Sequence, residues 1–304
     1  MFRHNRLIRA LSVISSTLLI TGGAATLSAA APPPPVNYVN LGDSFGAGMG
    51  SGDDTVRPAY NLQPPSLFDG QCLGGGYDHV TKFSHRKGIN LVADAACGGA
   101  TSTDMAAIAD IAAGRGELGT STQLVSMTVG GNDLGLYQLF LTCSKFRDQA
   151  PFPLPSCADA VAGIATALPS QAAIYAANLA HVRALAPNAK VVWLGYPRIF
   201  SPGYLTDADP FITPANAAML NAGIDRLNAT LAAVATGGGA TFADVTSRFD
   251  GHGYGSPTPW INSGPWASLD DFFNSPALHP NETGYIEGYY PALNSSVVVP
   301  ALQR

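Results

Sequence analysis

Short apolar runs recur along this chain and alternate with stretches in which apolar residues follow a helical spacing. The runs cover residues 36–41, 90–95, 124–129, 191–194 and 241–245, and each has the length of a strand. Strands that alternate with helices are typical of a parallel sheet covered by helices on both faces. The pattern therefore predicts an α/β fold, a three-layer α/β/α sandwich with a central parallel sheet.

Two of the intervening segments have a clear helical periodicity. The first carries apolar residues four, three and four positions apart, at Tyr175, Leu179, Val182 and Ala186. The second has a similar spacing at Leu220, Ile224, Leu227, Leu231 and Val234, and we expect it to end at the three glycines 237–239. Residues 51–76 and 198–210 are rich in Pro, Gly, Asp and Ser. They are predicted to be long loops that either line a substrate cleft or serve only as connectors.

The first thirty residues have the plan of a secretory signal peptide. Three arginines come before a short apolar core at residues 11–20, and small residues then lead to Pro32. An apolar core of this length, interrupted by serine and threonine, is too short to span a membrane. We therefore expect cleavage after Ala29 or Ala30, a secreted protein without stable membrane insertion, and a single domain over residues 31–304.

Composition narrows the range of partners. Hydrophobic residues make up 46% of the chain, which is enough for a substantial core. Without the three arginines of the leader, 13 basic residues face 21 acidic ones, a net charge of −8. A nucleic-acid-binding protein would carry a basic face, so no nucleic-acid partner is expected. Four cysteines in an exported chain favour disulfides over a metal site, in any of three connectivities.

Three polar motifs directly follow predicted strands. Ser44 lies in Gly42-Asp43-Ser44-Phe45-Gly46 after the first strand, and Gly99 follows the second. Asn132, in Gly130-Gly131-Asn132-Asp133, follows the third. Because ligands of open α/β sheets bind outside the carboxyl ends of the strands, we expect these three residues to meet at one edge of the sheet.

Each motif also has an interpretation without catalysis. Gly-Asp-Ser is ordinary turn chemistry, in which the Asp43 side chain would bond to the backbone. Asn132 or Asp133 could cap a following helix. The sequence around Ser44 also matches the Gly-x-Ser-x-Gly elbow of α/β-hydrolases. In that fold, however, the serine follows several strands, whereas Ser44 follows the first.

The residue types are those of an acyl-transfer enzyme. A serine hydroxyl is a weak nucleophile that needs an adjacent base, and the tetrahedral intermediate needs hydrogen-bond donors at its oxyanion. Ser44, His279 and Asn132 are residues of these types. A neutral His279 would take the proton from Ser44 and later give it to the leaving alcohol. Activity is then expected to rise with pH as the imidazole loses its proton.

These motifs and their order closely resemble the SGNH (GDSL-type) esterase and lipase family. The resemblance runs from about Val36 to the C-terminus and includes Cys97-Gly98-Gly99-Ala100-Thr101 and the block from His279 to Tyr285. It implies a flavodoxin-like fold and a secreted serine esterase or lipase that needs no cofactor. It further implies an oxyanion hole made by the Ser44 and Gly99 N–H groups and the Asn132 amide, with Gly98 as the competing assignment for Gly99. Of the possible disulfides, it favours Cys72–Cys97 and Cys143–Cys157.

One position departs from the family pattern. Many members carry an aspartate three residues before the histidine, where this chain has Pro276. Some actinobacterial relatives use a main-chain carbonyl at that place. The resemblance therefore implies a Ser44–His279 dyad in which the Pro276 carbonyl accepts a hydrogen bond from the imidazole Nδ1–H. Asp270 or Asp271 stays open as an alternative partner.

Among the other histidines, His252 is the main competitor for the base, because its glycine-rich loop could face a cleft. His181 falls on a predicted helix and is expected to be structural or exposed. His79 and His85 lie in a polar segment without a partner pattern. Neither His-x-x-x-His nor Cys-x-x-Cys occurs, so no metal site is expected.

The expected function is hydrolysis of carboxylic esters through an acyl-enzyme on Ser44. We expect a monomer that acts on small-molecule or lipid esters of small to medium acyl length. Two alternatives stay open: an acyltransferase that passes the same acyl group to an alcohol, and a secreted binding protein that keeps the fold without turnover. The missing aspartate before His279 is the one feature that favours the binding protein.

Overall fold

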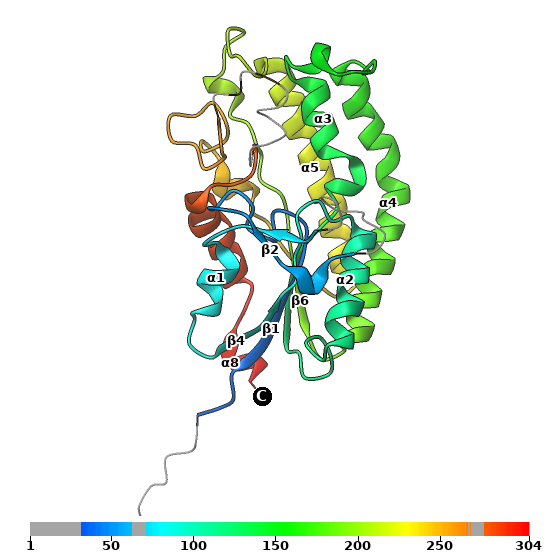
Figure 1. The fold of residues 1–304 in the computed structure, drawn as a ribbon, viewed down its shortest axis with the longest axis vertical. Coiled ribbons are helices and arrows are strands. Elements are labelled where there is room, and N and C mark those ends of the chain that lie inside the picture. The colour runs from blue at the N-terminus through cyan, green and yellow to red at the C-terminus, as the bar shows by residue number, and fades with distance from the viewer. Residues whose placement is uncertain (1–31, 63–70, 265, 267, 269–276, 304) are drawn as a thin grey trace, which may run out of the picture. The chain divides into compact units, whose positions relative to one another are not determined.

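The structure is a computed structural model that describes residues 32–62, 71–264, 266, 268 and 277–303 (Figure 1). By its internal contacts the chain separates into Met1–Pro33 and Pro34–Arg304, and all that follows concerns the second unit. The predicted signal peptide lies outside the described residues, as do Pro276, Asp270 and Asp271.

Five parallel strands form the central sheet, in the order β4-β1-β5-β6-β7. They are β1 Val36–Gly42, β4 Ile89–Asp94, β5 Leu124–Thr128, β6 Lys190–Leu194 and β7 Thr241–Ala243. Counted along the chain, this is the flavodoxin-like order 2-1-3-4-5, whose topological switch point lies between β1 and β5. All five predicted strands are confirmed, with their ends shifted by one or two residues.

Helices cover both faces of this sheet, which confirms the three-layer sandwich (Figure 1). One face carries α2 Ser102–Gly114, α4 Cys157–Leu185 and α5 Pro214–Gly237. The other face carries α1 His79–Ser84 and α7 Tyr290–Ser295, which follows a π-helical segment at Gly284–Tyr289. The remaining α-helices of the described residues are α3 Leu136–Cys143 and the short α8 Val299–Leu302.

The burial of the strands explains why they were visible in the sequence. Every residue of β5 is buried, and β1 is buried except at Asn37. Strands covered on both faces must be apolar at successive positions, so they form continuous runs rather than an alternating pattern. Two polar residues inside these strands satisfy each other, because the Ser126 hydroxyl donates to Asn40 Oδ1 at 2.7 Å.

Both predicted helices are confirmed. In α4, Tyr175, Leu179 and Val182 are fully buried, and α5 buries four apolar residues of its predicted face and ends at Gly237. Among the described residues, α4 is the one helix long and apolar enough to cross a membrane. That is weak evidence for a span, because a helix of a soluble protein can pass the same test.

Several elements were not predicted. The helices α1, α2 and α3 are short or rich in alanine and lack a strong periodic pattern. The segment expected to be a long loop contains a small antiparallel pair, β2 Thr55–Val56 and β3 Leu73–Gly74, and a 3₁₀ turn at Pro58–Tyr60. Two-residue strands are too short to produce a hydrophobic pattern, so this pair carries no sequence signal.

Two disulfides form, Cys72–Cys97 and Cys143–Cys157, the pairs that the family resemblance implied. The first joins the region of β3 to the loop between β4 and α2, and the second joins the end of α3 to the start of α4. Their sequence separations are 25 and 14 residues. Loops of this size stabilise the folded state by about 3 kcal/mol each in the chain-entropy model.

Candidate active site

A cavity of about 420 Å³ opens at the carboxyl ends of β1, β4 and β5. Ser44, Gly99, Asn132 and His279 all line it, although they come from four separate parts of the sequence. Its size is in the usual range for small-molecule sites, and its place at the switch point is where open α/β sheets bind ligands. The sequence-predicted residues therefore meet in one cavity.

Ser44 and His279 are in direct contact there. The His279 Nε2 atom lies 2.8 Å from the Ser44 Oγ atom, and the Ser44 side chain is nearly buried. This is the distance expected between a nucleophile and its base. The two residues are 235 positions apart in the sequence, so the fold alone brings them together.

The turn that carries Ser44 depends on a glycine at the end of β1. Gly42 has a φ of +132°, and a Cβ atom at this position would lie 2.2 Å from the Thr128 carbonyl oxygen. Without a side chain, the backbone can approach the end of β5, where the Asp43 N–H donates to the Thr128 carbonyl at 2.8 Å. Gly42 thus lets the Ser44 turn pack against β5.

Asp43 lies buried beneath Ser44, with its carboxylate fixed by three donors. It accepts from the Phe45 N–H and the Thr128 hydroxyl, each at 3.0 Å, and from the Tyr196 hydroxyl. The predicted role as a turn residue that bonds to the backbone is confirmed. Burial raises the pKa of Asp43 from 3.8 to about 6, and the hydrogen bonds from Tyr196, Phe45 and Thr128 offset part of that rise.

Tyr196 connects the Ser44 turn to the Asn132 loop. Its hydroxyl donates to Asp43 and accepts from the Gly131 N–H at 2.9 Å. A second tyrosine, Tyr175 on α4, donates to the Gly130 carbonyl at 2.8 Å. Both glycines of the Asn132 motif are therefore held by buried tyrosine hydroxyls, which the sequence analysis did not identify.

Asn132 opens a 3₁₀ turn at Asn132–Leu134, and its Nδ2 donates to the Ala100 carbonyl at 2.9 Å. Neither Asn132 nor Asp133 caps this turn, because the cap position is Gly131, without a side-chain bond. Asp133 instead accepts from the Ser102 N–H at 2.9 Å, in the first turn of α2. The Asn132 loop is thus tied at two points to the segment that follows Gly99.

The two candidate glycines of the neighbouring loop are in different environments. The Gly98 N–H donates to the Leu73 carbonyl at 2.8 Å, and Gly98 is not among the residues that line the cavity. Gly99 lines the cavity with a φ of +79°, a conformation that favours glycine. Of these two candidates for the oxyanion donor, Gly99 is therefore the one that lies at the cavity.

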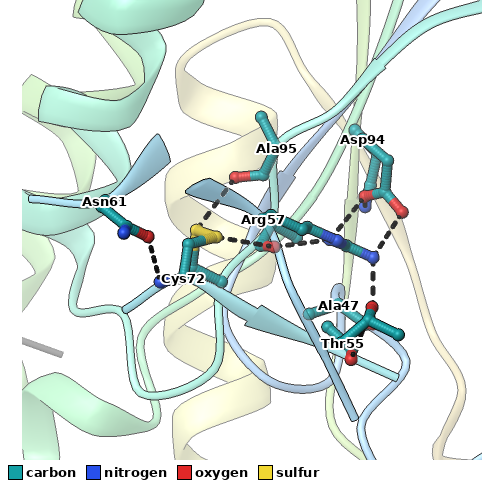
Figure 2. Close-up of a disulfide and its surroundings, with 11 residues drawn as sticks. Ala47, Thr55, Arg57, Asn61, Cys72, Asp94 and Ala95 are labelled. Atoms are coloured by element: carbon teal, nitrogen blue, oxygen red, sulfur yellow. Dashed lines mark hydrogen bonds and ion pairs between the residues drawn. A yellow bond between two sulfur atoms is a disulfide. The ribbon is translucent and has the colours of Figure 1, made fainter. Parts of the chain in front are cut away.

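The segments around the Cys72–Cys97 disulfide are also held by a partly buried ion pair (Figure 2). The Arg57 guanidinium contacts the Asp94 carboxylate through both terminal nitrogens, at 2.7 and 3.1 Å. It also donates to the Ala96 carbonyl at 2.6 Å and to the Ala47 carbonyl at 3.4 Å. Because Ala47 follows Ser44 and Ala96 precedes Gly99, Arg57 joins the two loops.

The other nitrogen of the His279 ring defines its tautomer. Nδ1 lies 3.1 Å from the Ala277 main-chain carbonyl. A carbonyl oxygen can only accept, so Nδ1 carries the proton, and Nε2 can accept from the Ser44 hydroxyl. Between the two residues, Leu278 has a φ of +60°, a conformation that is strained for a leucine.

The backbone at His279 is fixed by an asparagine that the sequence analysis missed. The Asn262 side-chain amide donates to the His279 carbonyl at 3.2 Å and to the Gly50 carbonyl at 3.0 Å. The Asn262 N–H also donates to the His279 carbonyl, at 2.8 Å. Asn262 therefore ties the histidine segment to the loop that follows Ser44.

Comparison with known proteins agrees with this geometry. Residues 41–285 match the family model described as the GDSL-like lipase/acylhydrolase family. The chain belongs to this family. Lipase 1 of Streptomyces coelicolor is 30% identical over 260 residues, which cover 85% of this chain and 86% of that protein. A lipase of Streptomyces rimosus is 31% identical over 262 residues, 86% of each chain.

The fold is also similar to solved structures of Streptomyces lipolytic enzymes. The phospholipase A1 of Streptomyces albidoflavus superposes with a TM-score of 0.65 at 27% identity, covering 88% of this chain and all of that one. The extracellular lipase of Streptomyces rimosus gives a TM-score of 0.64 at 27% identity, covering 86% of this chain and all of that one. As a member of the GDSL family, this protein is a lipase or esterase, a hydrolase of carboxylic esters.

Of the histidines that the structure of this GDSL-family enzyme describes, only His279 lines the cavity. His252, the competing base, stacks on Trp260 with ring centroids 3.9 Å apart. His181 contacts Asp110 at 2.8 Å on the surface. His79 is fully buried, and burial lowers its pKa to about 3. Among the described residues, no group of three or more histidine, cysteine or acidic side chains could hold a metal ion.

The cavity walls are largely apolar. Met49 comes from the loop that follows Ser44, Leu73 comes from β3, and α3 contributes Leu136, Tyr137 and Phe140. This wall was not predicted, because α3 has no distinctive pattern in the sequence. Five aromatic residues of the surrounding loops do not line the cavity: Tyr77, Phe200, Tyr204, Trp260 and Trp266. Phe200 and Trp266 instead belong to a buried aromatic cluster around Phe211.

The raised pKa of Asp43 predicts how stability depends on pH. Since the folded-state pKa of about 6 exceeds 3.8, the folded protein binds this proton more tightly than the unfolded chain. The contribution of Asp43 to the free energy of unfolding therefore falls as pH rises through this window. Asp43→Asn removes the titration. We expect the unfolding free energy of the variant, relative to the parent, to increase by about 2 kcal/mol from pH 4 to pH 6.

Urea denaturation at several pH values, with the disulfides intact, measures this difference. A difference between variant and parent that stays constant, or that shrinks as pH rises, would contradict the assignment.

Proposed function

We propose that this enzyme hydrolyses carboxylic esters through an acyl-enzyme on Ser44, with His279 as the general base. The observation that carries the proposal is the 2.8 Å contact between Ser44 Oγ and the His279 Nε2 atom, at the floor of the cavity. The neutral tautomer with its proton on Nδ1 leaves Nε2 able to take the serine proton as the hydroxyl attacks the ester carbonyl.

The developing oxyanion requires donors that are already in place. The Asn132 amide has two N–H bonds, and its bond to the Ala100 carbonyl fixes the side chain with one of them. The second N–H, together with the N–H groups of Gly99 and Ser44, would stabilise the oxyanion. The alternative donor, the Gly98 N–H, is already bonded to the Leu73 carbonyl. Donors held in advance lose little energy to reorganisation during the reaction.

The reaction then divides into two similar steps. His279, now protonated, gives its proton to the leaving alcohol, and the acyl group stays on Ser44. A water molecule next attacks the acyl-enzyme while His279 again serves as base, which releases the carboxylic acid and restores the serine.

The Nδ1 partner of His279 replaces the aspartate found in many family members. We assign this role to a main-chain carbonyl, and the Ala277 carbonyl, 3.1 Å from Nδ1, supports the assignment. The Pro276 carbonyl, which the sequence favoured, and the alternatives Asp270 and Asp271 lie outside the described residues. A carbonyl dipole stabilises the imidazolium less than a full carboxylate charge does, but it fixes the same tautomer.

The cavity and the relatives support a substrate class and a location for this enzyme. The apolar walls and the volume of about 420 Å³ suit uncharged acyl groups of small to medium length. The similar proteins include lipases and a phospholipase A1. Two disulfides, and the likeness to an extracellular lipase, support secretion after removal of the signal peptide near Ala29 or Ala30.

Hydrolysis of p-nitrophenyl acetate, butyrate and palmitate by the purified mature protein tests this function. We expect turnover of the shorter esters and its loss in a Ser44→Ala variant, which keeps the fold because a buried hydroxyl is replaced by a small apolar group. Turnover that persists in folded Ser44→Ala protein would show that another residue is the nucleophile.

A further inference from the structure

We propose that Asp54 makes this enzyme selective for uncharged ester substrates over anionic ones. The inference rests on the proposed function, because it concerns which esters reach Ser44. Asp54 directly precedes β2 and lines the cavity, yet it is solvent-exposed, so it lies at the cavity rim. It is a specificity-determining residue rather than a catalytic one.

A second carboxylate, that of Asp43, also lines the cavity, but it is buried and hydrogen-bonded rather than exposed. Asp43 is buried, and three hydrogen bonds from Phe45, Thr128 and Tyr196 engage its oxygens. It belongs to the support of the Ser44 turn. Asp54, in contrast, stands at the opening through which a substrate enters. Partial burial and the neighbouring Asp53 carboxylate raise the pKa of Asp54 above its ordinary value, as expected for a carboxylate at a crowded rim.

No lysine or arginine among the described residues of the cavity compensates the Asp54 charge. The next basic residue along the chain, Arg57, is mostly buried and paired with Asp94 at 2.7 Å. Residues 63–70 and 269–276, which lie outside the description, contain three aspartates and neither lysine nor arginine. Within the described part of the cavity, a negatively charged substrate would therefore meet the Asp54 carboxylate at the rim and no lysine or arginine.

The size of the effect follows from electrostatics at a protein surface. Repulsion between two like charges about 8 Å apart, in a medium of intermediate dielectric constant, lowers the association constant of a charged substrate by roughly 5- to 10-fold. Salt screens such an interaction over about 10 Å at 0.1 M. The penalty for an anionic substrate should therefore be largest at low ionic strength and should shrink as salt is added.

Two esters of equal acyl length test the proposal: p-nitrophenyl valerate, which is neutral, and mono-p-nitrophenyl glutarate, which is anionic. The measured quantity is the ratio of kcat/KM for the glutarate to that for the valerate, at about pH 8, where both carboxylates are charged. We expect Asp54→Asn to raise this ratio about 5- to 10-fold at low salt, and less at high salt. The matched control is Asp53→Asn, an exposed neighbour that does not line the cavity, for which we expect a much smaller rise in the ratio.

Several outcomes would overturn the proposal. An unchanged ratio in Asp54→Asn, or an equal rise in Asp53→Asn, would show that Asp54 does not select against anions. If the parent enzyme turns over the glutarate too slowly to detect, Asp54→Asn must make turnover measurable, and failure to do so overturns the proposal. Assay of Ser44→Ala on p-nitrophenyl valerate distinguishes failure of this proposal from failure of the proposed function. Turnover that persists in that variant would contradict the proposed function itself.

Discussion

Replacing His279 by alanine is expected to lower kcat for p-nitrophenyl butyrate by about 10⁴-fold or more, with little change in the stability of the fold. The imidazole Nε2 lies 2.8 Å from Ser44 Oγ, and no other described histidine lines the cavity. Without this base, the serine hydroxyl attacks at its ordinary and very low reactivity. Steady-state kinetics beside circular dichroism of the variant measure the effect.

His252→Ala is the matched control, because His252 was the competing candidate for the base. Its ring stacks on Trp260 away from the cavity, so we expect the variant to keep activity within a few fold. The double variant Ser44→Ala/His279→Ala should be no slower than either single variant, since the two residues act as a unit. An active His279→Ala enzyme, or an inactive but folded His252→Ala enzyme, would refute the assignment of the base.

Asn132→Ala is expected to lower kcat by about 10²- to 10³-fold, with a much smaller change in KM. The amide N–H would bond more strongly to the oxyanion than to the ester carbonyl of the bound substrate. Its removal therefore raises the barrier of the chemical step more than it weakens binding. The kinetics of the short p-nitrophenyl esters separate the two parameters.

A second variant tests whether the loss of activity comes only from the loss of a structural hydrogen bond. Asn132→Ala also removes the bond to the Ala100 carbonyl at 2.9 Å. Asn188 makes a similar bond from its amide to the Thr120 carbonyl at 2.8 Å, outside the cavity. Asn188→Ala therefore removes one amide–carbonyl bond without touching the site and should leave kcat unchanged. A kcat for Asn132→Ala within a few fold of the parent value would exclude its amide as an oxyanion donor.

The sheet and the meeting point of the motifs were predictable from the sequence, for physical reasons. Strands buried on both faces must be apolar at successive positions, so β1 and β5 are visible as continuous runs. Parallel strands have their carboxyl ends at one edge, so residues just after them, such as Ser44 and Asn132, must come close together. The choice of His279 over His252 as the base depended on the family resemblance, because both histidines lie in segments that could face a cleft.

The supports of the site were not predictable in this way. Tyr196 bonds to Asp43 and Gly131, which are 153 and 65 residues away, and nothing near Tyr196 in the sequence marks it. Asn262 holds the His279 backbone through bonds that any loop asparagine could make. The α3 wall is invisible for a related reason: eight mostly apolar residues can be a strand, a helix or core. Hydrogen bonds between distant residues, and cavity walls built from several segments, depend on the folded structure and leave no local pattern in the sequence.

Covalent trapping tests the acyl-enzyme on Ser44 most directly. A p-nitrophenyl phosphonate ester with a short alkyl chain mimics the tetrahedral intermediate and leaves a stable adduct on an activated serine. We expect one equivalent of p-nitrophenol per protein molecule, complete loss of ester hydrolysis, and an added mass on the peptide that contains Ser44. Labelling of another residue with the same loss of activity, or undiminished labelling of Ser44→Ala protein, would contradict Ser44 as the nucleophile.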